Sequence, residues 1–353
     1  MNHLLTIFLF LVAILGQAQE SSTLIWNLQC LNRSAIFPEV DTYIGTPSPV
    51  VTDKKVSISG DPHNFESFSM YFWPDTLSPD SPYVYRDCLR NPEGDTYDLK
   101  KINALARRTR LLSQAYHLTR NQKYANQWLT DIQAWFIDKQ TRMNPNFDYA
   151  QFVKNLNNNR GNYFGIIEAY VFVDIIESIR LMRSYGQLDR STDRKLQKWF
   201  RQFARWLRTS PLGIKQSQAP NNLSVAYDVM SCAIDLYIGD TPHFNILVQQ
   251  FADRRLYAQI QSDGSQPQEM CRALPLTYAI YNLQHVTDFC VMLYHIGIDY
   301  YHQHQARIDA AIKYIQQQLA DTTRLNAAEQ TDHHSLTVKT RMIQAQLQSI
   351  STK

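Results

Sequence analysis

Polar side chains that can exchange protons or bind anions lie in four stretches of the sequence, at positions that a helical repeat does not require. Those in the N-terminal half are His63, Tyr71, Trp73, Gln151 and Arg160. Those further along are Asn221, Asn222, Tyr227, Arg272 and Tyr278. The aromatic members could also stack on the face of a sugar ring. Each residue type has an ordinary structural role as well, so no single residue in this set indicates a function.

The later residues lie on predicted helices, which limits how they can meet. Asn221 and Asn222 begin a helical pattern, and a helix needs only one of them as its cap. Arg272 and Tyr278 are about one and two-thirds helical turns apart, so they need not share a face. A bend after the loop at Pro267 would let these two long side chains converge.

The order of the stretches resembles that of a known family. From about residue 61 to 292 the chain contains, in turn, DPHNF, YFWPD, PYVYRD, NPEGD, TRMNPNFDYAQ, NRG, GIIE, APNN, YDV, QPQE, CR and YNL. This succession is similar to that of the bacterial alginate lyase superfamily of polysaccharide lyases. The resemblance implies an incomplete (α/α) toroid with a central cleft, and β-elimination on a uronate-containing polysaccharide.

The resemblance also implies roles for individual residues. β-Elimination requires that the uronate carboxylate be neutralised, that a base take the C5 proton and that an acid protonate the departing O4. By motif position, Asn222 and Arg272 would hold the carboxylate, and Tyr278 would act at the proton and the leaving oxygen. The residues expected to line the cleft and bind substrate are Asn221, Trp73, Tyr71, Gln151, Arg160 and Tyr227.

The chain departs from the family at one position of this motif. The family histidine falls on Leu223, whose side chain can neither carry charge nor donate a hydrogen bond. His63, in an aromatic loop region expected over the cleft, is the candidate catalytic replacement. Without one, the protein would be a non-catalytic or impaired uronan-binding protein. The presence of Tyr278 and Arg272 favours catalysis.

The missing histidine also bears on the sugar that is cleaved. In β-linked mannuronate or glucuronate the C5 hydrogen and O4 lie on the same ring face, so one tyrosine can be both base and acid. Guluronate places them on opposite faces and requires a second group. The sequence therefore predicts syn elimination at mannuronate or glucuronate linkages.

A toroidal glycoside hydrolase is the less favoured enzyme class, because it would need two carboxylic acids flanking the scissile bond. The spacing of the available acids singles out no pair. The candidates are Asp75, Glu168, Asp174, Asp228 and Glu269.

The elements that must position these residues are mostly helices. Apolar residues recur at helical spacing in about nine segments, and hardly a strand is indicated. The segments are 99–116, 124–136, 164–185, 191–208, 222–238, 243–260, 272–297, 303–320 and 335–350. We therefore predict an all-α protein, an incomplete (α/α) toroid over residues 98–353. Residues 19–97, which are rich in proline and aromatic residues, are predicted to form an ordered loop region packed on the toroid, within a single catalytic domain.

The N-terminus and the overall charge indicate where the protein acts. The uncharged run from Leu4 to Leu15 is too short to span a bilayer and is followed by small residues, so residues 1–18 are predicted to be a signal peptide. The mature chain is then exported, periplasmic or secreted, with no membrane anchor. A formal charge of +3 over 353 residues, without a basic block, does not favour nucleic acid as a partner. An acidic polysaccharide is the expected partner.

Five cysteines without C-x-x-C spacing argue against a zinc site, and no phosphate loop or dinucleotide motif is present. We expect no metal and no cofactor. Cys30 and Cys88 could form a disulfide in an oxidising compartment, but sequence alone does not give the connectivity.

Overall fold

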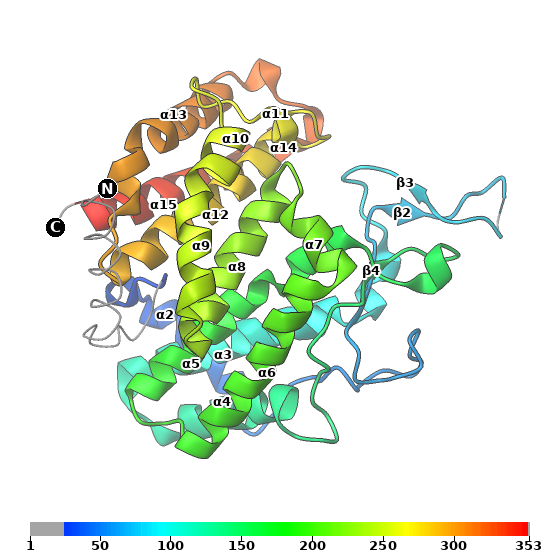
Figure 1. The fold of residues 1–353 in the computed structure, drawn as a ribbon, viewed down its shortest axis with the longest axis vertical. Helices are drawn as coiled ribbons and strands as arrows, with labels where there is room; N and C mark the ends of the chain where they lie inside the picture. The colour runs from blue at the N-terminus through cyan, green and yellow to red at the C-terminus, as the bar shows by residue number, and fades with distance from the viewer. Residues whose placement is uncertain (1–24, 79, 352–353) are drawn as a thin grey trace.

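Long helices form the body of the molecule, which the computed structural model describes over residues 25–78 and 80–351 (Figure 1). The predicted signal peptide lies outside the described residues. The long helices are α3 Leu99–Thr119, α4 Gln122–Phe136, α5 Phe172–Ser184, α6 Arg190–Thr209, α8 Asn222–Ile238, α9 Thr241–Phe251, α12 Pro275–His295, α13 Tyr300–Ala320 and α15 His333–Ser351. The predicted all-α class is confirmed.

The helices are arranged in two layers. In the inner layer α3, α5, α8, α12 and α15 each contact the next in this order. On the outside, α4 packs on α3, α6 and α9 pack on α8, and α13 packs on α12. The helical body thus consists of an inner and an outer layer of helices.

Shorter helical pieces connect the long ones. They are η1 Leu28–Cys30, α2 Arg33–Val40, η2 Asp41–Tyr43, η3 Pro92–Thr96, η4 Asn157–Asn159, η5 Tyr163–Val171, α7 Pro211–Ser217, the π-helical η6 Ala252–Leu256, α10 Tyr257–Gln259, α11 Pro267–Met270, η7 Thr322–Arg324 and α14 Ala327–Thr331. Three predicted segments need correction in detail. The segment 164–185 begins as the 3-10 helix η5, and the segment 243–260 is interrupted by η6. The segment predicted as 272–297 is α12, which begins at Pro275.

The N-terminal region is more regular than predicted. Helix α2 lies within it and packs on α3. Strand β1 (Glu66–Phe68) pairs in parallel with β4 (Tyr149–Phe152), and β2 (Phe72–Trp73) pairs in antiparallel fashion with β3 (Val84–Tyr85). These strands are too short for an alternating pattern to be read in the sequence. Residues 71–78 and 80–88, which include β2 and β3 and which we call the arm, project from the helical body (Figure 1).

Local sequence explains where several helices begin and end. Asn121, Asp189 and Asn221 precede α4, α6 and α8, and the side chain of each accepts a hydrogen bond from a backbone N–H of the first turn. Helix α8 ends at Gly239, whose φ of 76° is costly for a residue with a Cβ. Proline occupies the first turn of α7, α11 and α12, where its missing N–H has no helical partner to lose.

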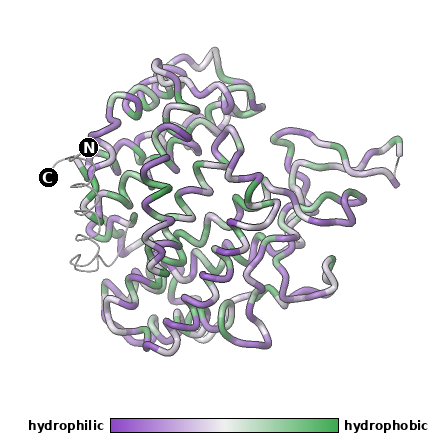
Figure 2. The backbone as a smooth tube through the Cα atoms, viewed as in Figure 1, coloured by the Kyte–Doolittle hydropathy of each residue, from purple (hydrophilic) through white to green (hydrophobic). Residues whose placement is uncertain are grey.

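A continuous apolar core lies between the two layers, and apolar and polar stretches alternate along the helices (Figure 2). Two buried ion pairs cross it. Arg108 of α3 binds Asp131 of α4 with an N–O distance of 2.9 Å, and Arg255 of η6 binds Asp228 of α8 at 2.7 Å. A change that removes one partner of either pair would leave an uncompensated buried charge, so both pairs fix how the layers pack.

Among the residues that the structure describes, no helix is both long enough and apolar enough to cross a membrane.

Candidate active site

Arg272 and Tyr278 lie against each other where the arm meets the start of α12. Arg272 is in the non-helical turn between α11 and α12, and its guanidinium carbon is 3.8 Å from the centroid of the Tyr278 ring. The bend after Pro267 thus brings together two side chains that a continuous helix would separate. A guanidinium on the face of a phenol ring is an attractive arrangement that also places positive charge beside the phenol oxygen.

The arm brings two more groups to the Tyr278 hydroxyl. That hydroxyl donates a hydrogen bond to the Tyr71 hydroxyl over 3.1 Å, and the Cys88 sulfur is 4.0 Å from it. Burial raises the pKa of Tyr278 well above its ordinary value, the bond to Tyr71 raises it further, and Arg272 lowers it. Tyr278 is therefore a neutral phenol in the resting site, able to donate a proton.

Asp87 in the arm holds Arg272 in place. Its carboxylate accepts hydrogen bonds from Arg272 Nη2 (2.7 Å) and Nε (3.1 Å), from the Tyr85 hydroxyl (2.6 Å) and from the Ala273 backbone N–H (3.0 Å). Burial alone would raise the pKa of Asp87, but the hydrogen bonds from Arg272 and Tyr85 hold it well below its usual range. Arg272 Nη1 has no hydrogen-bond partner among the described residues, so one edge of the guanidinium remains for a ligand.

Asn222 lies at the start of α8 and is bound to α11. Its backbone N–H and its side-chain Nδ2 donate to the two oxygens of the buried Glu269, over 2.6 and 2.8 Å. Burial raises the pKa of Glu269, against the hydrogen bonds from Asn222. The neighbouring Asn221 caps α8, and Leu223 follows in the first turn. No hydrogen bond joins Asn222 to Arg272 or Tyr278 in the described chain.

Three predicted substrate-binding residues have partners within the protein. Trp73 donates from Nε1 to the Leu89 carbonyl over 2.9 Å, and Arg160 donates to the Tyr149 hydroxyl over 2.9 Å. Tyr227 is the third of these residues. It is only 5% exposed and donates to the Leu207 carbonyl, because the inner-layer helix α8 is buried on nearly all sides.

Gln151, a predicted substrate-binding residue, contacts the buried carboxyl group of Glu168. The sequence suggested Glu168 only as an acid for a glycoside hydrolase. Gln151 adopts a left-handed φ of 47°, and its side-chain amide donates to Glu168 over 2.9 Å. The Ser67 hydroxyl donates to the other oxygen of Glu168. Burial raises the pKa of Glu168 to about 8, against these two hydrogen bonds. Glu168 is therefore protonated at neutral pH.

We expect Glu168 to make the protein less stable as the pH rises from about 4.5 to about 8. In this range the folded state keeps the Glu168 proton and the unfolded state loses it, so the free energy of unfolding falls as the pH increases. Integrated over the range, the loss is on the order of 4 kcal/mol. Glu168→Gln removes the titrating group, so urea unfolding at pH 5 and pH 8 should show a smaller loss for the variant. Parallel curves for the two proteins would contradict the assignment.

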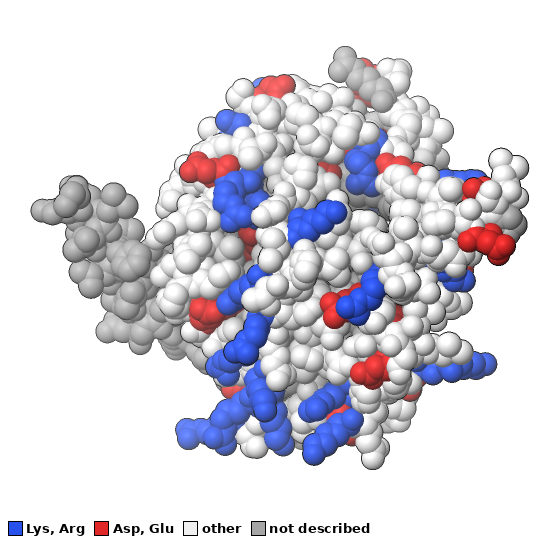
Figure 3. Space-filling model, turned by 45° about the vertical axis from the view of Figure 1, so that its right-hand side comes forward, with Lys and Arg blue, Asp and Glu red and all other residues white. Residues whose placement is uncertain are grey.

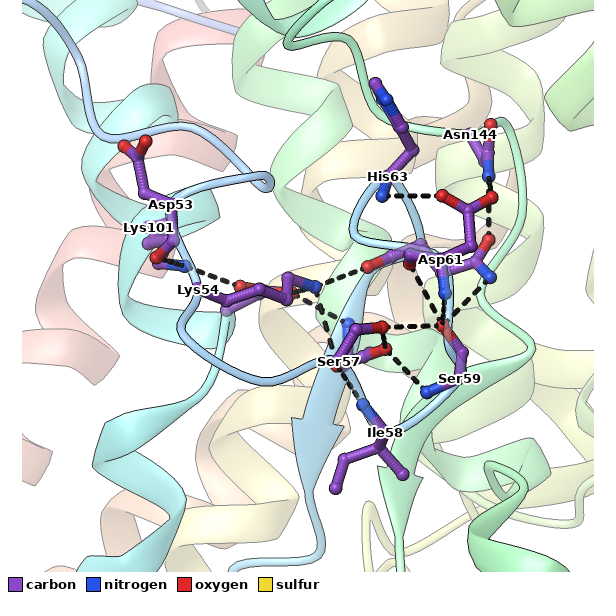
Figure 4. A network of polar contacts seen from close by, with 12 residues as sticks. Asp53, Lys54, Ser57, Ile58, Ser59, Asp61, His63, Lys101 and Asn144 are labelled. Carbon is purple, nitrogen blue, oxygen red and sulfur yellow. Dashed lines mark hydrogen bonds and ion pairs between the residues drawn. The ribbon is translucent and has the colours of Figure 1, made fainter.

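His63 lies in a different polar network, between residues 59–64 and the loop before β4 (Figure 4). Its ring Nδ1 donates to the Arg142 carbonyl over 2.7 Å, and its backbone N–H donates to Asp61. Asn144 donates to the other oxygen of Asp61. Within the described residues His63 makes no hydrogen bond to Tyr278, Arg272 or Asn222.

The acids considered for a glycoside hydrolase each bind other residues and not one another. Asp228 and Glu269 are paired with Arg255 and Asn222 as described above. Asp174 accepts a hydrogen bond from Trp26, and Asp75 accepts one from the Leu77 backbone. No hydrogen bond joins any two of the five candidate acids in the described part of the chain.

The cysteines give one correction. All five are free, so the suggested Cys30–Cys88 disulfide is not formed. Cys88 lies instead beside Tyr278, because the arm that carries it docks on α12. Over residues 25–78 and 80–351, no group of three or more His, Cys, Asp or Glu side chains is placed to hold a metal ion.

Little in the sequence indicated that Asp87 and Cys88 belong to the candidate site. Asp87 is part of the PYVYRD stretch but lies 185 residues from Arg272 in the chain, and no local pattern relates the two. Cys88 gave no signal beyond its presence in the loop region.

Comparison with known proteins gives consistent matches. A family model described as alginate lyase matches residues 50–325. The crystal structure of an alginate lyase from Bacteroides ovatus superposes with a TM-score of 0.84 and 28% sequence identity, covering 97% of this chain and 90% of that one. None of the curated proteins compared with the chain matches it.

More distant structures share the fold. Alginate lyase A1-III from Sphingomonas species A1 has a TM-score of 0.53 and 17% identity, over 84% of this chain and 75% of that one. A variant of that enzyme, solved in complex with a tetrasaccharide, has a TM-score of 0.53 and 18% identity, with the same coverage of both chains. Because the family model spans most of the chain and the structural match extends over nearly all of it, the protein belongs to the alginate lyase family.

Proposed function

We propose that the protein is a polysaccharide lyase that cleaves β-linked mannuronate or glucuronate linkages by syn β-elimination. The observation that carries this proposal is the contact of Arg272 with the Tyr278 ring, with the Tyr71 hydroxyl 3.1 Å from that of Tyr278. An arginine that can hold a carboxylate thus lies next to a tyrosine that can exchange protons. Family membership and the tetrasaccharide complex of a relative support a polysaccharide substrate.

The arrangement suggests how each group acts. Arg272, held by Asp87 on one edge, offers Nη1 to the substrate carboxylate, and Asn222 Nδ2 has a second hydrogen to donate. The neutralised carboxylate makes the C5 proton more acidic. Tyr278 then accepts the C5 proton while its own proton passes to O4. The C5–H and C4–O4 bonds break, a C4–C5 double bond forms, and Tyr278 is neutral before and after.

The second candidate function is a uronan-binding protein without lyase activity, which Leu223 favours. A panel of polymannuronate, polyguluronate and glucuronate-containing polymers separates the two, with turnover read as the absorbance of the unsaturated product. The lyase proposal expects product from mannuronate or glucuronate polymers and little from polyguluronate. Binding without any product would support the second candidate. We also propose that the mature chain acts after export, as the N-terminal sequence predicts.

We expect Leu223→His to raise activity and His63→Ala to leave it nearly unchanged. Leu223 is partly exposed in the first turn of α8, where a histidine side chain would add a hydrogen-bonding group beside Asn222. His63 bonds to Arg142 in a different network, so its ring has no contact through which to reach the reacting groups. Initial rates on polymannuronate check both changes. A large loss of activity in His63→Ala would show that His63 has taken over the missing histidine's role.

A further inference from the structure

Helix α6 carries a line of positive charge on its outer face. Its members, spaced by four, four, three and four residues, are all exposed: Arg190, Arg194, Lys198, Arg201 and Arg205. At about 1.5 Å per residue the line is about 22 Å long, with one cation per helical turn. We call these five residues the basic stripe. Figure 3 shows Lys and Arg side chains gathered on the lower part of the side of the molecule that it draws.

The charges of the basic stripe are not neutralised within the protein. None of the five residues forms an ion pair with another described residue, although Arg201 donates to Gln197 and to the Ile238 carbonyl. The two acids at the start of the helix are used elsewhere. Asp189 caps α6, and Asp193 binds Tyr237 and Arg183. A chain with a net charge of only +3 therefore concentrates five unpaired cations on one helix face.

The stripe leads toward the segment that carries Arg160. Next to Arg205, Trp206 donates from Nε1 to Asp148 over 3.0 Å. Asp148 directly precedes Tyr149, the residue whose hydroxyl binds Arg160. Helix α6 also continues through α7 to Asn221 and Asn222. The C-terminal end of the stripe is thus connected with two parts of the candidate site.

We propose that the basic stripe is a second binding surface for the same acidic polysaccharide, separate from the residues of the candidate active site. A linear 1→4-linked uronan presents one carboxylate per sugar ring, a repeat of the same order as the helical turn that separates the cations of the stripe. Helix α6 has no exposed large apolar side chain that could enter a bilayer beside the stripe, which fits an extended polymer better than a membrane. The inference rests on the proposed function, since it takes the substrate to be a polyuronate.

The test compares two triple variants with the same loss of charge. Arg194→Gln, Lys198→Gln and Arg205→Gln neutralise the stripe, whereas Lys55→Gln, Lys313→Gln and Arg341→Gln remove three exposed cations elsewhere. Glutamine is a good helix former, so α6, α13 and α15 should persist, and Lys55 lies outside the helices. We expect the stripe variant to raise KM for long polymannuronate about tenfold at low salt, as three weak exposed contacts would. Its rate on a tetrasaccharide should not change, and the control should match the wild type.

Salt and binding measurements complete the test. The KM of the wild type for polymer should rise more steeply with salt than that of the stripe variant. In the Tyr278→Phe background, affinity electrophoresis in polymannuronate should show the same loss of binding without turnover. Equal KM values for the two triple variants, or a stripe-dependent attachment to vesicles of anionic phospholipid but not to polymer, would overturn the inference. A wild type that forms no unsaturated product would overturn the proposed function instead, and polymer binding would then decide on the stripe.

Discussion

Tyr278→Phe should reduce turnover by about 10²- to 10⁴-fold, the usual contribution of a general acid–base group. The change removes one oxygen and leaves the ring on which the Arg272 guanidinium lies at 3.8 Å. The reaction then lacks both the acceptor for the C5 proton and the donor to O4. Rates of formation of unsaturated product on polymannuronate measure the effect.

The matching control is Tyr71, whose hydroxyl is hydrogen-bonded to that of Tyr278. Tyr71→Phe also removes a phenol oxygen, 3.1 Å from that of Tyr278, but leaves the reacting oxygen in place. We expect a smaller loss of turnover for Tyr71→Phe than for Tyr278→Phe. Calorimetry should show that Tyr278→Phe still binds oligomannuronate with nearly wild-type affinity. A Tyr278→Phe variant with full activity would rule out the mechanism.

Arg272→Lys should reduce kcat by about 10²- to 10³-fold, a loss typical of removing one preorganised group that stabilises charge in the transition state. Lysine keeps the positive charge but has no planar fork. It cannot at once hold both oxygens of Asp87, lie on the Tyr278 ring and offer an N–H to the substrate. Steady-state kinetics on polymannuronate provide the measurement.

Asp87→Asn tests whether Asp87 acts by holding Arg272 in position or only through its negative charge. The asparagine keeps the shape of Asp87 but can accept through only one oxygen, so Arg272 would lose one of its two hydrogen bonds. If Asp87 positions Arg272, kcat should fall while KM for a tetrasaccharide changes little. A lower KM with unchanged kcat would mean that Asp87 competes with the substrate carboxylate, and the positioning role would be wrong.

Sequence periodicity predicted the long helices well because each buries an apolar stripe. The amphipathic pattern of α4 and α6, for example, gives their bounds to within about two residues. Helix α2 and the short strands were missed, since pieces of two to eight residues carry too little periodicity. Helix α7 was missed for the same reason, although Ser210 and Pro211 are a cap and a first-turn proline.

The candidate site could be predicted only in part. Motif order indicated Arg272 and Tyr278, and the structure places them in contact. The Asp87 carboxylate could not be predicted, because a tertiary contact across the arm leaves no local signal. Tyr227 was assigned to the cleft from its motif, but it is only 5% exposed, because α8 is buried on nearly all sides.

The two halves of the candidate site come from distant parts of the chain. Asp87 and Tyr71 lie 185 and 207 residues before the side chains they bond, and the arm reaches them across the molecule. Contacts of such sequence separation are slow to form, because closing so long a loop costs conformational entropy before the contact contributes. A nascent or truncated chain that ends before α12 would therefore be enzymatically silent, even with most of its helices made. If the proposed lyase function holds, activity would therefore appear only when the last quarter of the polypeptide has been made and has packed against the arm.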